Sequence, residues 1–409
     1  MKKILFIPLC IVLIFISVDS LDAQCFFNPD QQKWESTNGG PCGNTVFSAV
    51  PFLRITPDAR TGGMGDAGIA ISGDANAMHY NMSKLAFVEQ EFSLSATYSP
   101  WLRDLGLQDV YLAYLAGYKK LNEFEAIGLS LRYFSLGDVA FTDENGQPIG
   151  NGRPNEFEIG LGYARKLSDR LSVGITGKFI YSNLAAGQTI GNTDIKAAIA
   201  GAADISFTYS APSGEYNNLT AGIVLSNIGS RISYTQSTFR DYLPANLGLG
   251  VAYDFNFDDF NKLTITLDAN KLMVPTPIFP ELSPGVPNPE YDENNNGEPD
   301  FKEQGTIGAL FSSFGDAPNG FSEELKEFTF SLGAEYWYED QFAVRAGYFY
   351  ENPLKGNRQY LTLGLGIKYN IFGMNISYLV PTNNQRSPLD NTLRFSLIFN
   401  FDQEGDPDL

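Results

Sequence analysis

Apolar and polar residues alternate with a period of two over most of the chain after residue 90. For example, Leu361, Leu363, Leu365 and Ile367 alternate with Thr362, Gly364, Gly366 and Lys368. Since successive side chains of a strand point to opposite faces, each such run predicts a β-strand with one apolar and one polar face. The runs start near residues 91, 108, 124, 156, 171, 197, 219, 245, 263, 328, 342, 359, 372 and 391. They predict fourteen strands, an even number, as single-chain bacterial outer-membrane barrels require.

A soluble β-sandwich would also alternate, but two features favour a transmembrane barrel. Several strands end in an aromatic residue such as Tyr133, Tyr163 or Tyr369, as in the aromatic girdles of membrane barrels. The polar faces carry scattered charges, which a dry core would not tolerate unpaired. A closed barrel also pairs every backbone group that lies in lipid. We therefore predict an all-β fold, a transmembrane antiparallel β-barrel of about 14 strands over residues 91–401, followed by an acidic C-terminal tail at residues 402–409.

The first residues indicate export. Lys2 and Lys3 precede an apolar run over residues 4–18, and small or apolar residues follow before Gln24. This pattern is typical of a secretory signal peptide, which we place at residues 1–23. A membrane anchor is the alternative, but the run is shorter than the roughly 20 residues that a spanning helix needs. A lipid anchor on Cys25 is disfavoured by Asp22 and Gln24. The expected location is the cell outer membrane, in contact with its lipid.

The amino-acid composition of the chain narrows the classes of function that it can have. The chain has 40 Gly, 31 Phe and 21 Tyr but only 18% charged residues, against roughly 25% in average soluble proteins. A net charge of -19 argues against nucleic-acid binding, which needs Lys and Arg at the phosphates. His79 is the only histidine, and no nucleophile elbow, phosphate loop or Cys/His cluster occurs. We expect no enzyme activity and no cofactor, and we interpret His79 as a hydrogen-bonded structural residue.

Two cysteines remain after the signal peptide, Cys25 and Cys42, separated by a polar segment rich in Gly, Asn and Pro. In an exported protein this pair predicts a disulfide that fixes the mature N-terminus. Two free thiols are the alternative.

Residues 24–90 precede the first strand and break the alternation, with a short helix expected near residues 74–87. A segment of this length can fold into the lumen as a plug. Its charged residues, Arg54, Asp58, Arg60 and Asp66, would then have to be paired. We expect them to pair with each other or with inward-facing groups such as Arg132 and Lys178. A solvated periplasmic segment is the alternative. The glycines Gly62, Gly63 and Gly65 predict a tight turn, since a nucleotide loop would need a preceding strand.

A second interruption, residues 275–327, is rich in proline and acidic residues. A loop this long is uncommon without a function, and barrels place their long loops outside the cell. Residues 292–303 fit the twelve-residue calcium loop of EF-hands, in which oxygen ligands surround a sharp glycine turn at Gly297. The candidate Ca²⁺ ligands are Asp292, Asn294, Asn296, Glu298 through its carbonyl, Asp300 and Glu303. Pro299 and the lack of flanking helices favour the alternative, a solvated acidic turn.

Several blocks of sequence resemble a known family. Residues 51–68 (PFLRITPDARTGGMGDAG) strongly resemble the opening segment of the PorV family, FadL-like outer-membrane barrels of the type IX secretion system of Bacteroidetes. Residues 74–81 (DANAMHYN), 98–103 (YSPWLR) and 131–137 (LRYFSLG) are similar to the blocks that follow in that family. The resemblance extends over essentially the whole mature chain. One departure is Met82-Ser83, where the family has Pro-Ala, and it should alter only a local turn.

The resemblance implies fourteen strands, a plug and a role in secretion. Members of the family take secreted cargo proteins with type IX C-terminal domains from a translocon barrel. They deliver them to a cell-surface attachment complex with a PorU-like sortase, so that the barrel acts as a carrier and scaffold. Two alternatives stay open: a FadL-like transporter of hydrophobic small molecules, and an outer-membrane enzyme, which the single histidine disfavours.

Overall fold

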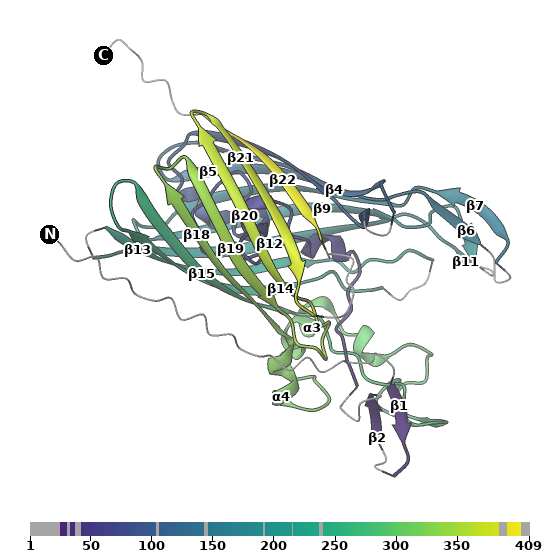
Figure 1. Cartoon of the computed structure of the whole chain (residues 1–409). Helices are drawn as coiled ribbons and strands as arrows, with labels where there is room; N and C mark the ends of the chain where they lie inside the picture. The colour runs from purple at the N-terminus through teal and green to yellow at the C-terminus, as the bar shows by residue number, and fades with distance from the viewer. Residues whose placement is uncertain are drawn as a thin grey trace.

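Fourteen strands close into one antiparallel barrel in a computed structural model of the chain (Figure 1). The structure describes residues 25–30, 33–36, 42–103, 106–142, 146–190, 193–214, 216–236, 240–383 and 391–401. The expected signal peptide and the acidic tail at residues 402–409 lie outside these ranges. The fold prediction is confirmed.

The barrel strands follow one another in chain order, and the last pairs with the first. They are β3 (Phe92–Pro100), β4 (Val110–Lys120), β5 (Glu125–Leu136), β8 (Asn155–Lys166), β9 (Leu171–Asn183), β12 (Ala198–Ser213), β13 (Asn217–Gly229), β14 (Asn246–Asn256), β15 (Asn261–Leu272), β18 (Phe328–Tyr338), β19 (Phe342–Tyr350), β20 (Gln359–Tyr369), β21 (Phe372–Pro381) and β22 (Leu393–Phe401). The closing pair runs from Phe395 opposite Tyr98 to Phe401 opposite Phe92. Every strand starts within two residues of its predicted position.

The two faces of each strand meet different surroundings, as the alternation predicts. In β20, Leu361, Leu363 and Leu365 are 49%, 58% and 60% exposed, whereas Thr362 between them is buried. The apolar side chains therefore form the outer surface and the small and polar ones face the lumen, the arrangement of a lipid-embedded barrel. Among the described residues, no helix is long and apolar enough to cross a bilayer.

The two ends of the barrel differ. At one end, six turns of two to four residues join successive strands, whereas the connections at the other end are longer and carry their own elements. We assign the long-loop end to the cell exterior. It carries the hairpins β6 (Val139–Thr142) and β7 (Pro148–Gly152), β10 (Thr189–Ile190) and β11 (Thr193–Asp194), and β16 (Glu281–Ser283) and β17 (Val286–Pro287), the short helices η4 (Asp300–Lys302), α3 (Thr306–Ser312) and α4 (Phe321–Glu324), and η5 (Leu325–Glu327). We call residues 273–327, between β15 and β18, the insert.

The N-terminal segment begins outside and passes down the lumen. It consists of β1 (Cys25–Asn28), β2 (Lys33–Ser36), η1 (Pro51–Arg54), α1 (Ala59–Gly62), α2 (Ala77–Tyr80) and η2 (Met82–Ala86). Near the outer end, Phe52 and Leu53 pack with Trp101 and Phe134. Near the periplasmic end, Met82 and its neighbours pack against the inner wall, and β3 starts there. The segment from residue 44 to residue 90, which we call the plug, therefore spans the lumen, and a solvated periplasmic segment is excluded.

The helix expected near residues 74–87 is two short helical turns instead of one helix. Asn81 separates them with an extended backbone, and its side chain accepts a hydrogen bond from the Ser83 N–H (3.1 Å). Its amide nitrogen donates to the Ile69 carbonyl (2.9 Å) and to Thr208 on the wall (2.9 Å). A residue with this many partners outside the helix favours a break in it.

Candidate functional site

Asp58 organises the start of the plug. Its carboxylate accepts hydrogen bonds from the N–H groups of Arg60 (2.9 Å) and Thr61 (3.0 Å), which caps α1. The same carboxylate accepts the Tyr80 hydroxyl at 2.7 Å. His79 precedes that tyrosine, packs its ring edge-on against it, and contacts Arg132 on the wall. These contacts hold two distant parts of the plug together.

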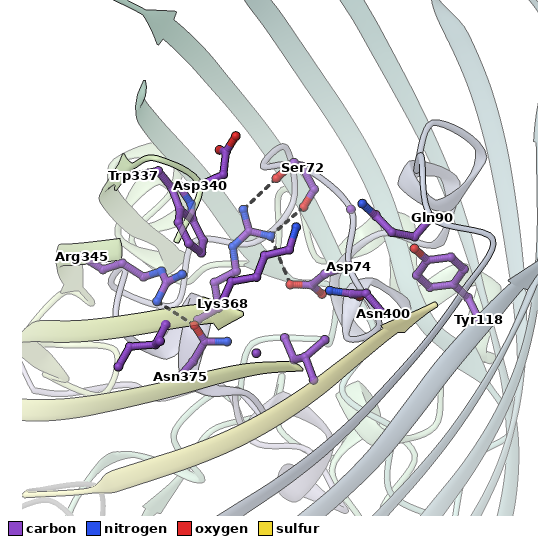
Figure 2. A pocket seen from close by; sticks show the side chains of 15 residues that line it. Ser72, Asp74, Gln90, Tyr118, Trp337, Asp340, Arg345, Lys368, Asn375 and Asn400 are labelled. Atoms are coloured by element: carbon purple, nitrogen blue, oxygen red, sulfur yellow. Dashed lines mark hydrogen bonds and ion pairs between the residues drawn. The ribbon is translucent and has the colours of Figure 1, made fainter. Parts of the chain in front are cut away.

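Arg60 fastens the plug to the barrel wall. Its guanidinium lies 2.7 Å from the Glu335 carboxylate on β18 and 3.1 Å from Asp74 in the plug. Glu335 also accepts from Arg345 on β19 at 2.6 Å. Arg345 in turn donates to Asn375 on β21 at 2.9 Å (Figure 2). One buried carboxylate is thus shared by two arginines. Removing a partner from such a cluster leaves an uncompensated buried charge.

The glycines of the plug allow its backbone to touch the wall. At Gly65, where φ is +66°, an added Cβ would lie 2.6 Å from the Tyr348 nitrogen, and at Gly63 it would lie 2.9 Å from Gly364. A Cβ at Gly62 would meet Arg394 at 2.7 Å. The chain turns directly after α1, as the glycines predict.

Asp66 follows this turn and contacts β20 and β22, on the same side of the barrel. It accepts the Tyr360 hydroxyl at 2.5 Å and lies 3.7 Å from the Arg394 guanidinium. Arg54, by contrast, makes no hydrogen bond and no ion pair in the part of the chain that the structure describes. Its guanidinium lies in a cavity that also contains Arg358.

The ion partners expected for the plug are only partly correct. Arg132 and Lys178 do not pair with plug carboxylates, because the wall supplies Glu158 (3.6 Å) and Asp204 (2.7 Å) on neighbouring strands. Arg132 instead donates to the plug backbone at the Leu53 carbonyl (2.8 Å). The partners that were missed, Glu335 and Arg394, are inward-facing charges on late strands. The period-two pattern of their strands predicts that both side chains face the lumen. It does not predict which plug residue each of them contacts.

A second buried charge cluster holds the insert to the rim. Lys271, at the end of β15, lies 2.5 Å from Glu327 and 3.0 Å from Glu324. Lys355, in the loop after β19, lies 2.5 Å from Glu323 and 3.0 Å from Glu327. The five side chains are at most 7% exposed. We call this set the insert cluster; the sequence analysis did not identify it.

The upper surface of the insert is apolar and exposed. Ile307 and Phe311 lie four residues apart on α3 and are 62% and 76% exposed, while Phe321 and Leu325 at α4 are 75% and 53% exposed. We call these four residues the apolar face. Large apolar side chains that are exposed on extracellular helices are of the kind that protein interaction surfaces use.

The expected calcium ligands lie together within residues 292–303. Asn294 donates from its amide to Asp300 (3.1 Å) and to Glu303 (2.9 Å), and Asp292 accepts the N–H groups of Asn296 (3.1 Å) and Gly297 (2.8 Å). Glu298 donates its N–H to the side chain of Asn296 (2.9 Å). The described residues contain no group of three or more His, Cys, Asp or Glu arranged to hold a metal ion. Calcium binding therefore stays a prediction.

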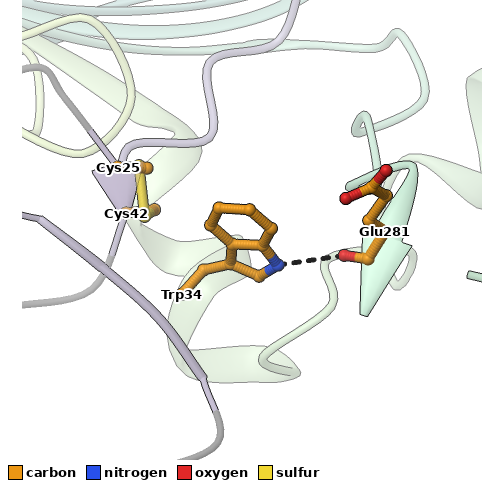
Figure 3. The surroundings of a disulfide bond; sticks show 4 residues. All are labelled: Cys25, Trp34, Cys42 and Glu281. Carbon is orange, nitrogen blue, oxygen red and sulfur yellow. Dashed lines mark hydrogen bonds between the residues drawn. A yellow bond between two sulfur atoms is a disulfide. The ribbon is translucent and has the colours of Figure 1, made fainter. Parts of the chain in front are cut away.

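Cys25 and Cys42 form a disulfide, which closes the segment that carries β1 and β2 (Figure 3). Trp34 on β2 donates from its indole N–H to the Glu281 carbonyl in the insert at 3.0 Å. Asn44, at the entry to the lumen, donates to the Pro277 carbonyl at 2.8 Å. The disulfide-closed hairpin and the insert therefore form one extracellular layer above the barrel.

These features define an integral outer-membrane β-barrel whose lumen is occupied by its own N-terminal segment. A family model described as type IX secretion system protein PorV matches residues 41–279, and the chain belongs to this family. It is an integral protein of the outer membrane.

Two solved structures to which the chain is similar are a toluene transporter and a FadL homologue. The Ralstonia pickettii toluene transporter TbuX is 12% identical with a TM-score of 0.47, and the match covers 84% of this chain and 98% of that one. A Pseudomonas aeruginosa FadL homologue is 12% identical with a TM-score of 0.42, over 88% of this chain and 100% of that one. None of the curated proteins matches the sequence.

Proposed function

We propose that this protein is an outer-membrane carrier of type IX secretion. In this proposal it receives the C-terminal domain of a secreted cargo protein at a translocon barrel and delivers the cargo to a PorU-like sortase at the cell surface. Membership in the PorV family supports a role in this secretion system. The observation that carries the finer role is the apolar face, which the insert cluster holds at the outer rim.

The plug supports a role that does not use the lumen as a protein passage. It spans the barrel and is fastened by buried charges along one arc of the wall, from Glu335 on β18 to Arg394 on β22. A protein chain could pass only if these pairs were broken, at a cost of several kcal/mol for each uncompensated charge. The binding surface is therefore expected outside the lumen.

The position of α3 supports a partner that lies in the same membrane. Leu310, on the underside of α3, packs with Leu225 and Leu247 at the ends of β13 and β14. Leu247 belongs to the outward face that continues with Leu249, which is 40% exposed. Ile307 and Phe311 of the apolar face thus lie on a helix beside the lipid-facing wall, where a neighbouring barrel or cargo held by it can reach them.

Site-specific crosslinking tests the proposal. A photoreactive phenylalanine analogue replaces Phe311 in the native membrane, and a matched replacement of Phe257, which is 64% exposed in a periplasmic turn, serves as the control. Phe311 should crosslink to cargo C-terminal domains or to the translocon barrel, and Phe257 to neither. Normal cargo secretion by a deletion strain would contradict the proposal.

The alternative, a transporter of hydrophobic small molecules, is favoured by one observation. A cavity of about 390 Å³ lies in the outer half of the lumen, and part of its lining is apolar. Transport predicts loss of uptake in a deletion strain together with normal protein secretion, the opposite pattern to that of the carrier.

A further inference from the structure

Aromatic side chains ring the outer surface of the barrel at its periplasmic end. They come from the strand ends beside the short turns and are exposed, as are Tyr209, Tyr338, Phe342, Tyr369, Phe372 and Phe401. Phe372 packs on Phe399 of the next strand with ring centroids 5.7 Å apart. Such a girdle marks the level at which the apolar core of a membrane meets the lipid headgroups.

Two cations interrupt this girdle on β4 and β8. Lys119 pairs in register with Phe92 on one side and with Ile127 on the other, so the three side chains share the outer face. Arg165 lies four residues after Leu161, which is 65% exposed, and therefore points to the same face. We call Lys119 and Arg165 the girdle cations. Only β5 lies between their strands, so their backbones are about 10 Å apart across the sheet.

The nearest carboxylate does not neutralise both girdle cations. Glu125 on β5 accepts hydrogen bonds from the Tyr163 hydroxyl at 2.6 Å and from the Asn122 amide at 2.8 Å, and Arg165 lies 3.4 Å from it. The Arg165 side chain is nevertheless 58% exposed. The Lys119 ammonium makes no hydrogen bond and no ion pair in the part of the chain that the structure describes, and this residue is exposed. Two cations thus share one carboxylate that already has other partners.

The turns beside the girdle cations are basic, although the whole chain carries a net charge of -19. Residues 119–125 and 165–170 hold five basic and three acidic side chains. By contrast, residues 254–262 and 338–342, around two other periplasmic turns, hold one basic and five acidic ones. Because exposed charges of one sign add to a local potential, this side of the periplasmic end attracts anions and the other repels them.

We propose that the girdle cations bind the phosphate group of an anionic phospholipid in the periplasmic leaflet of the outer membrane. The girdle places both cations at the level of the headgroups. Their face continues toward the membrane core with exposed apolar side chains such as Leu115 and Leu161, along which the acyl chains of the lipid can lie. Lysine and arginine donate charge-assisted hydrogen bonds to phosphate oxygens, and clustered basic residues at a membrane surface favour anionic lipids.

The position of the girdle cations favours a lipid over a soluble periplasmic protein, because they lie on the lipid-facing surface of the strands. The site goes beyond the carrier role and does not depend on it. It would give one side of the barrel a preferred lipid neighbour.

Native mass spectrometry of the full-length barrel in a non-ionic detergent tests this site. The probes are phosphatidylglycerol and phosphatidylethanolamine with identical acyl chains, with inorganic phosphate as a competitor. The variant K119Q/R165Q removes both girdle cations, and K119R/R165K keeps both charges. The matched control, K262Q/K368Q, removes two lysines of β15 and β20 at the same end of the barrel. Heat-modifiability on gels checks that each variant folds.

The unmodified protein should bind phosphatidylglycerol at least about tenfold more tightly than phosphatidylethanolamine, since each basic residue at a membrane surface contributes a factor of about five. K119Q/R165Q should lose this preference, whereas K119R/R165K and K262Q/K368Q should keep it. Millimolar inorganic phosphate should not displace the lipid.

The proposal is overturned if the unmodified protein has no preference, if K119Q/R165Q keeps it, or if K119R/R165K or K262Q/K368Q loses it. Displacement of the lipid by phosphate would show a site for free anions and would also overturn it. If there is no lipid preference and K119Q/R165Q loses a crosslinked periplasmic protein, the girdle cations bind an acidic protein instead. Because the measurement uses no secretion, its failure is distinguishable from failure of the carrier role.

Discussion

The plug and the insert are both held to the barrel by buried charges, but they expose opposite chemistry. The charged residues of the plug lie inside the lumen, where Arg60 borders a cavity of about 200 Å³ at the periplasmic end and Arg54 borders one of about 390 Å³ in the outer half. The insert buries its charged side chains where it meets the barrel rim, and it exposes the apolar side chains of the apolar face to solvent. Ion pairs of this kind fix a geometry more than they stabilise a fold. The comparison teaches that buried ion pairs can fix one region inside the lumen and hold another at the outer surface with its apolar side chains exposed.

Replacing Arg60 by Ala should give the largest effect. The change leaves Asp74 and Glu335 with less counter-charge inside the lumen, and we expect about 3–5 kcal/mol of destabilisation. Heat-modifiability and urea unfolding measure it. R153A, which breaks the exposed pair of Arg153 and Asp138, should leave stability nearly unchanged, because solvent screens an exposed ion pair. Equal effects of the two variants would show that the plug is not locked by its charges.

Replacing Lys271 by Met should release the insert without opening the barrel. Glu324 and Glu327 lose their shared partner, at a local cost of about 1.5–3 kcal/mol, so that protease cleavage within residues 273–327 should rise roughly tenfold or more. Limited proteolysis followed by mass spectrometry measures it. Lys262 pairs with Asp340 at the exposed periplasmic end, and K262M is the matched control. Unchanged cleavage in K271M would show that the insert cluster does not hold the insert to the rim.

A smaller effect is expected from pH. Burial raises the pKa of Asp316 in the insert to about 6, with Glu324 and Glu327 adding to the shift. Because the folded-state pKa is raised, protonated Asp316 favours the docked insert, and this contribution is lost as the pH rises from about 4 through 6. Proteolysis of the insert should therefore be faster at pH 7 than at pH 5. In D316N the difference should disappear, and if it persists another group is responsible.

The smallest effect concerns the acidic loop at residues 292–303. If it is a calcium loop, millimolar Ca²⁺ should give saturable heat in titration calorimetry and slow its proteolysis, and D292N should abolish both. Mg²⁺ at the same concentration is the control. No saturable binding would leave the loop as a hydrogen-bonded acidic turn.

The sequence predicts the strands of the barrel, but not the contacts that hold the plug and the insert to it. All fourteen strands start within two residues of their predicted positions. The alternation of apolar and polar residues can be recognised within each strand, because one face of the strand meets lipid and the other meets the lumen. The partner of Arg60 could not be predicted, because Glu335 is 275 residues away and reaches the plug only after the barrel closes. The insert cluster is non-local in the same way, since it joins Lys271 and Lys355 across several strands.

The path of the N-terminal segment has a mechanical consequence. Its outer end carries the hairpin that the disulfide between Cys25 and Cys42 closes. Its inner end continues into β3, which pairs with β22 and so closes the barrel. The segment is therefore held at both ends, and it can leave the lumen toward the periplasm only if the hairpin unfolds or β3 separates from β22. Where the disulfide forms first, the segment must therefore enter the lumen before β22 pairs with β3.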